Sequence, residues 1–244
     1  WKERQANPGA SGELLIIPQP RRLIAGKGSF PVRPGVRLLT PAGLSSREEQ
    51  GVSLLSEELK LRFGLDAVVR PPSTSDSPQG AILLGEPSRN PLVAAQLKRW
   101  QVEVTPALPG PEGYALRVTP DCIVVAGSDS PGTFYGIQTL LQLLKCDAQG
   151  ALQVPEVEIL DWPELKWRGF CLDDPLPCTG AALEDVRRLI RHVVARYKLN
   201  TFFFGTSYDC FQWKSHPELT PQGTGMTLRE LGELAQYCRA HYLE

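Results

Sequence analysis

Hydrophobic positions in this chain follow a helical period in some segments and a strand pattern in others. Apolar side chains in residues 45–63 fall on one helical face, while most charged residues fall elsewhere. This spacing predicts a helix over 45–63, with Gly64 as its C-terminal stop. We also expect a short helix at 91–99 and a turn at 26–30. Short apolar runs bounded by turn-forming residues predict strands at 14–18, 36–39, 67–69, 81–85 and 154–159.

The middle of the chain carries a hairpin pattern followed by a helical one. Residues 114–118 and 122–127 are two apolar runs about a Thr-Pro-Asp turn, which predicts two paired strands. After them, Ser130 is a candidate N-cap and Pro131 suits the first helical position. The apolar stripe that follows predicts a helix up to residue 144.

Strands and helices alternate regularly in the last third of the chain. The pattern predicts, in order, a strand, a helix, a strand and a helix at 166–172, 181–197, 200–205 and 227–241. Such alternation is typical of βαβ units with parallel strand pairing. Upstream, strands and helices follow no such order, which indicates an α+β domain.

The sequence therefore divides into three parts. We expect a flexible arm at 1–13, an α+β domain at 14–160, and the first part of a β/α domain at 161–244. Two strands cannot bury both of their helices or close a barrel, which takes about eight strands. We therefore expect 161–244 to pack on the first domain, to associate with another chain, or to expose apolar surface.

Bulk properties exclude several classes of function. The formal net charge of −1 over 244 residues gives no electrostatic case for binding nucleic acid or an anionic membrane. No apolar run approaches the roughly 20 residues of a membrane span. The six cysteines lack the spacing of a zinc site or a disulfide scaffold, and the three histidines are dispersed. We expect no metal and no other cofactor, and an exported location (periplasmic, extracellular or lysosomal) rather than a cytoplasmic one.

One stretch gathers candidate chemistry around a strand. Arg168 lies within the expected strand at 166–172, and Asp173 and Asp174 follow it. The active sites of β/α enzymes lie at the carboxyl ends of their strands, so we expect Arg168 and the two carboxylates to lie at the carboxyl end of this strand. In the alternative interpretation, Arg168 ties the strand to a carboxylate at a domain interface.

Three motifs together resemble one enzyme family. They are Glu-Gly-Tyr-Ala-Leu-Arg-Val at 112–118, Gly-Thr-Phe-Tyr-Gly-Ile-Gln-Thr-Leu-Leu-Gln-Leu at 132–143 and Trp-Arg-Gly-Phe at 167–170. In this combination the chain resembles family 20 glycoside hydrolases, the β-N-acetylhexosaminidases, over most of 14–244. The resemblance implies a non-catalytic, zincin-like α+β domain with helices on one face of its sheet, followed by the start of a TIM (β/α)8 barrel.

The resemblance also implies a reaction and a substrate class. Family 20 enzymes remove terminal β-linked N-acetylhexosamines from oligosaccharides or glycoconjugates, and the substrate's own 2-acetamido carbonyl attacks the anomeric carbon. An adjacent Asp-Glu pair on the fourth barrel strand orients the acetamido group and acts as acid and base. No such pair occurs at a matching place in this chain. We therefore expect no catalytic residue here and no activity from the chain alone.

Three residues are implied in binding the terminal sugar. Arg168 matches the arginine that binds sugar hydroxyls, and Asp173 matches a carboxylate that supports it. Asp209 is the one match to a pair of aspartates after the second strand, whereas Phe203 and Gly205 replace histidines of the family pattern. Two alternatives stay open: a non-catalytic carbohydrate-binding or interaction module on the same scaffold, and a member of the related family 84 N-acetylglucosaminidases.

Overall fold

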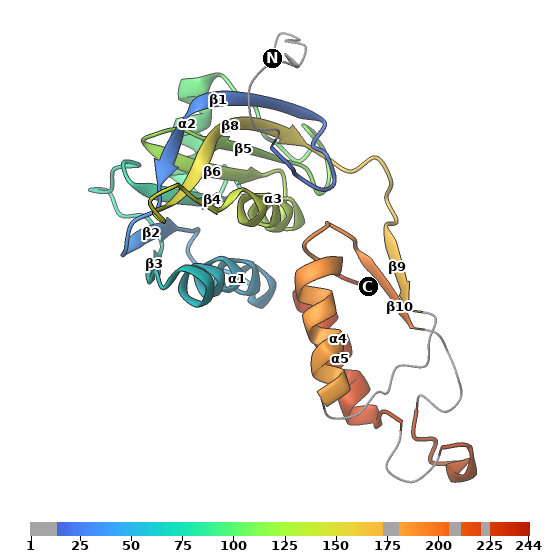
Figure 1. The fold of residues 1–244 in the computed structure, drawn as a ribbon. Coiled ribbons are helices and arrows are strands. Elements are labelled where there is room, and N and C mark those ends of the chain that lie inside the picture. Colours follow the sequence, from blue (N-terminus) through green and yellow to red (C-terminus); the bar gives the residue numbers. More distant parts are fainter. Residues whose placement is uncertain (1–13, 173–180, 205–210, 221–224) are drawn as a thin grey trace. The chain divides into compact units, whose positions relative to one another are not determined.

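The computed structural model describes residues 14–172, 181–204, 211–220 and 225–244 (Figure 1). The chain forms two compact units, Trp1–Glu164 and Leu165–Glu244, which are described separately. The expected arm at 1–13 lies outside the described residues. Among the described helices, none is long and apolar enough to cross a membrane.

The first unit is built on one mixed sheet. Its strands lie in the order β1-β8-β5-β6-β4-β2-β3, with β7 paired to β8. β6, β4, β2 and β3 pair in parallel, whereas β5, β8 and β1 pair antiparallel. This is the α+β architecture that the sequence predicts. In chain order the elements are β1 (Arg22–Pro31), β2 (Val36–Leu39), α1 (Ser46–Phe63), β3 (Ala67–Arg70), β4 (Ala81–Gly85), α2 (Pro91–Trp100), β5 (Tyr114–Val118), β6 (Cys122–Gly127), α3 (Ser130–Leu143), β7 (Lys145–Cys146) and β8 (Leu152–Asp161).

Helices cover both faces of this sheet, so the expectation of helices on one face is wrong. Tyr114 of β5 bonds to Thr139 of α3, whereas the adjacent Ala115 belongs to an apolar core cluster with Val93 and Leu97 of α2. Adjacent residues of a strand point to opposite faces, so α2 and α3 lie on opposite faces (Figure 1). β4 and β6 are accordingly buried at every position. Their unbroken apolar runs are the sequence signal for a sheet covered on both sides.

Local sequence sets the ends of the long helices. The Ser45 side chain accepts a hydrogen bond from the backbone N–H of Glu48, and the Glu48 carboxylate accepts one from the N–H of Ser45. This capping box confirms the predicted start of α1. The N-cap of α3 is Asp129 rather than Ser130, because its carboxylate accepts a hydrogen bond of 2.7 Å from the first turn. A charged acceptor binds a backbone N–H more strongly than a hydroxyl does.

Two predictions near the N-terminus are wrong. Residues 14–18 form no strand, and the backbone N–H and C=O of Ile17 instead bond to the side-chain amide of Gln142, each at 2.9 Å. Residues 26–30 are not a turn but part of β1, an edge strand whose side chains are mostly exposed. Such a strand lacks the apolar alternation from which strands are predicted. A bulge within β1 accommodates its glycines, against which Glu156 packs.

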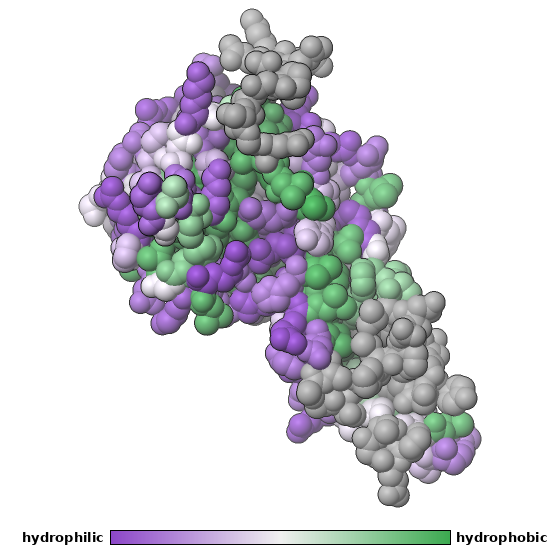
Figure 2. All heavy atoms as spheres, viewed as in Figure 1, coloured by the Kyte–Doolittle hydropathy of each residue, from purple (hydrophilic) through white to green (hydrophobic). Residues whose placement is uncertain are grey.

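The motif at 132–143 forms most of α3 and packs very closely on the sheet. A Cβ atom at Gly132 would lie 2.1 Å from the carbonyl oxygen of Gly113, and one at Gly136 would lie 2.4 Å from Cγ1 of Val125. Both distances are far shorter than real contacts, so these two positions require glycine. The motif that carries the family resemblance is therefore explained by packing. Figure 2 shows that hydrophilic side chains cover much of the visible surface of this unit.

A buried hydrogen-bond network joins β5, α3 and the end of β8. The Tyr114 hydroxyl lies 2.6 Å from Oγ1 of Thr139 and donates to Oδ2 of Asp161 at 2.9 Å. The other carboxylate oxygen, Oδ1, accepts from the backbone N–H of Arg21 at 3.2 Å. Burial raises the pKa of Tyr114 well above its usual value, and the negative charge of Asp161 adds to the shift. The phenol therefore stays protonated and remains a donor.

The second unit contains two parallel strands and the helices that connect and follow them. β9 and β10 pair in parallel, which confirms the predicted βαβ arrangement. Phe170 and Phe202 stack at 6.1 Å between ring centroids and belong to one core cluster with α4 and α5. Phe203, the next residue of β10, points to the opposite face and is 55% exposed. The elements are β9 (Gly169–Leu172), α4 (Ala181–Leu189), a π-helical turn (Ile190–Val194), β10 (Thr201–Phe204), a 3-10 turn (Pro217–Leu219) and α5 (Leu228–Ala240).

We expect Tyr114→Phe to lower the free energy of unfolding of the first unit by about 1–3 kcal/mol, because the buried Asp161 carboxylate loses a donor. Hydrogen exchange of the β5 and β6 amides measures this change within the unit itself. Thr139→Val and the double variant complete a mutant cycle, and we expect the two effects to be non-additive. Unchanged amide protection in Tyr114→Phe would show that the network does not stabilise the fold.

Candidate functional site

Arg168 lies immediately before β9, at the amino end of the strand. The pairing with β10 begins at Gly169, opposite Thr201. A Cβ atom at Gly169 would lie 2.9 Å from the ring of Phe203, so the strands approach closely there. The expected position of Arg168 at the carboxyl end is therefore wrong. The four residues of β9 separate it from that end by about 13 Å, at 3.3 Å per residue.

Backbone carbonyl groups hold the side chain of Arg168. Its Nε donates to the carbonyl oxygen of Lys198 and its Nη1 to that of Leu165, both at 2.8 Å. The backbone N–H of Arg168 donates to Oδ1 of Asn200 at 2.9 Å, and Nδ2 of Asn200 donates to the carbonyl oxygen of Lys166 at 2.8 Å. We call these four bonds the Arg168–Asn200 clamp, and three of them join the segment before β9 to the segment before β10.

The other two predicted sugar-binding residues, Asp173 and Asp209, lie outside the described residues. Their roles therefore stay predictions, and Arg168 is the one member of the set that the structure places. Sequence reasoning missed the role of Asn200 in the clamp. The sequence signal for this role was an amide side chain directly before an aromatic strand, because one amide can both donate and accept a hydrogen bond.

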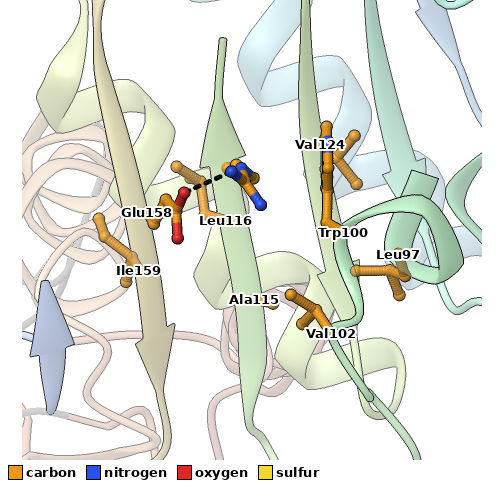
Figure 3. A pocket seen from close by; sticks show the side chains of 9 residues that line it. Leu97, Trp100, Val102, Ala115, Leu116, Val124, Glu158 and Ile159 are labelled. Atoms are coloured by element: carbon orange, nitrogen blue, oxygen red, sulfur yellow. Dashed lines mark ion pairs between the residues drawn. The ribbon is translucent and has the colours of Figure 1, made fainter. Parts of the chain in front are cut away.

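A second feature is a small cavity on the α2 side of the first unit (Figure 3). Its volume is about 10 Å³, which is room for about one water molecule. Arg117 forms an ion pair of 2.5 Å with Glu158 and lies 4.7 Å from the ring centroid of Trp100. These contacts close the cavity, so it is a packing defect rather than a ligand site. Within the described ranges, no group of three His, Cys, Asp or Glu side chains could hold a metal ion.

Comparison with known proteins decides the family. A sequence model described as "Glycosyl hydrolase family 20, domain 2" matches residues 13–162. The chain belongs to glycosyl hydrolase family 20. The matched range contains every described helix and strand of the first unit, so the first unit corresponds to domain 2 of this family.

Individual relatives extend the similarity into the second unit. A β-hexosaminidase of Porphyromonas gingivalis is 29% identical over 226 residues, which cover 88% of this chain and 26% of that protein. The structure of a Flavobacterium johnsoniae chitobiase matches with a TM-score of 0.70 at 22% identity, over 93% of this chain and 33% of its own. The structure of a Streptomyces plicatus N-acetyl-β-hexosaminidase matches with a TM-score of 0.67 at 25% identity, over 94% of this chain and 44% of its own. The family 20 chain thus spans less than half the length of each relative.

We expect Asn200→Ala to destabilise the second unit of this family 20 chain by about 1–3 kcal/mol, because it removes two bonds of the clamp. Asn200→Asp is the matched variant, since it keeps the acceptor for the N–H of Arg168 and loses only the donor to Lys166. It also places a negative charge against a carbonyl oxygen. Hydrogen exchange of the β9 and β10 amides measures the loss of stability in both variants. Equal protection in all three proteins would contradict a structural role for Asn200.

Proposed function

We propose that the protein to which this chain belongs is an exo-β-N-acetylhexosaminidase, which removes terminal β-linked N-acetylhexosamines from oligosaccharides or glycoconjugates. One observation carries the proposal. The similarity to the Porphyromonas gingivalis β-hexosaminidase covers 88% of the chain and so continues beyond the domain 2 match at 13–162. The similarity therefore includes the second unit, to which Arg168, Asp173 and Asp209 belong.

We further propose that the first unit is zincin-like and that the second unit is the start of a (β/α)8 barrel. Strand, helix, strand and helix follow one another in the second unit, with parallel pairing. After α5 the chain returns to β10: Glu244 donates to the carbonyl oxygen of Asn200 at 3.0 Å and accepts from the N–H of Phe202 at 2.9 Å. This exchange is that of a parallel bridge and supports a third parallel strand. In a closed barrel the exposed face of Phe203 would be the interior.

The proposed reaction is substrate-assisted and proceeds with retention at the anomeric carbon. The acetamido carbonyl oxygen attacks the anomeric carbon, the leaving oxygen takes a proton from an acid, and water then opens the cyclic intermediate. We assign neither the acid nor the group that orients the acetamide to this chain. Its share is recognition: Asp209 binds hydroxyls of the terminal sugar, and Arg168, supported by Asp173, joins it when its guanidinium leaves the clamp at the amino end of β9 and reaches along the strand. A sugar would bond to the planar guanidinium beside, or in place of, the clamp carbonyls.

The test uses the protein expressed from its complete reading frame and a chromogenic N-acetyl-β-glucosaminide. We expect Arg168→Lys to lower kcat/KM about 10- to 100-fold, because each hydrogen bond from a charged group contributes about 1.5–3 kcal/mol. Arg188→Lys is the control, since Arg188 is an exposed residue of α4 that pairs with Asp185. The thermal midpoint of each variant separates damage to the clamp from loss of sugar binding.

Two results would contradict different parts of the proposal. Wild-type protein that hydrolyses neither N-acetylglucosaminide nor N-acetylgalactosaminide substrates would contradict the activity. Active protein in which Arg168→Lys leaves kcat/KM unchanged would contradict only the role of Arg168, and would leave the clamp as its function.

A further inference from the structure

The first unit contains an open pocket of about 310 Å³ beside the C-terminal end of α2. Its apolar lining includes Leu160 of β8, Trp162 and the Leu108–Pro109 segment. Leu160 is buried and Trp162 is half-buried, whereas Leu108 is exposed at the rim. This volume lies at the lower end of the range of small-molecule sites, which is about 300–1,000 Å³.

The indole ring of Trp162 is held in place from outside the pocket. It packs against the apolar core cluster of the α2 side. The guanidinium of Arg21 lies 5.9 Å from its ring centroid, and Arg21 is itself paired with Glu164 at 2.8 Å. A ligand that contacts this ring therefore meets a surface with little conformational freedom to lose, and such pre-organisation favours binding.

Three polar side chains, Arg22, Gln101 and Glu103, also line the pocket. All three are exposed, and within the described part of the chain none of them has a hydrogen-bond or ion-pair partner. The guanidinium of Arg22 offers planar donors, the carboxylate of Glu103 offers acceptors, and the side-chain amide of Gln101 both donates and accepts. Their formal charges cancel, so the lining selects neither an anion nor a cation.

The backbone of Gln101 adds an independent observation. Gln101 caps α2 in the left-handed conformation, with φ of 57°. Helices commonly end in this conformation, but the residue there is usually glycine. Non-glycine residues with such a φ carry backbone strain and are concentrated at functional sites. The strained conformation keeps an amide side chain at the pocket where glycine would be more stable.

We propose that this pocket is a saccharide-binding site that takes one neutral pyranose ring. A pyranose has C–H faces that pack on an indole ring and on Leu108 and Pro109. Its rim of hydroxyl groups both donates and accepts, which matches the Gln101, Glu103 and Arg22 set. The site belongs to the first unit, whereas Arg168 belongs to the second, and it would hold one ring of a carbohydrate ligand. The choice of an N-acetylhexosamine as the ligand rests on the proposed function.

The test is to titrate the chain with N-acetylglucosamine and with its β-1,4-linked trimer, and to measure binding by calorimetry and NMR. We expect Gln101→Gly and Glu103→Gln each to weaken binding about 3- to 10-fold, the effect of one net hydrogen bond of about 0.5–1.5 kcal/mol. Gln101→Gly relieves the left-handed backbone, so its loss of binding cannot come from unfolding. Lys98→Ala on the same helix is the control, because Lys98 is exposed and does not line the pocket.

Arg168→Ala separates this site from the proposed active site. Binding that weakens in the two pocket variants and persists in Arg168→Ala supports the inference. Binding that is lost only in Arg168→Ala overturns the inference and leaves the proposed function standing. The inference is also overturned if no sugar binds at millimolar concentration. Free tryptophan is titrated as a competing class of ligand. Tighter binding of tryptophan than of either sugar would overturn the inference, because the ligand would then be a zwitterionic aromatic compound.

Discussion

The hydroxyl group of Tyr114 is the point at which the first unit is joined together. Through Thr139 and Asp161 it connects a central strand, the helix that covers it and the last residue of β8. Asp161 also accepts a hydrogen bond from the N–H of Arg21 just before β1, so one carboxylate holds the start of β1 beside the end of β8, its antiparallel partner. Because β8 leads directly to Trp162 and Glu164, the same network fixes the position of the pocket's aromatic ring and the end of the unit.

The residues by which this chain is recognised as a family 20 member serve packing more than chemistry. In the motif at 132–143, Gly132 and Gly136 permit close approach to the sheet, Thr139 bonds to Tyr114, and Gln142 binds the backbone of Ile17. A helix that fits this closely against a sheet tolerates few substitutions at the contacting positions. The motif locates no site, because function depends on side chains at the edges of the scaffold.

The site was only partly accessible from sequence. The family resemblance implied that Arg168 binds a sugar, but the assignment of its strand end failed because β9 starts at Gly169, three residues later than expected, which leaves Arg168 before the strand. Asn200 gained a role only through its pairing across 32 residues of sequence. The pocket at Trp162 is assembled from β1, the end of α2, the 108–109 segment and β8. No local pattern could bring those four segments together.

Sequence by itself determined the helices, the inner strands and the family. Caps such as Ser45 with Glu48 and the apolar runs of β4 and β6 act over a few residues, so local physics decides them. Tertiary structure alone decided that helices cover both faces, that the polar segment 26–30 is an edge strand, and that residues 14–18 bind a side chain instead of a strand. The last two features depend on partners more than 100 residues away, and the free energy of such pairing is absent from any local pattern.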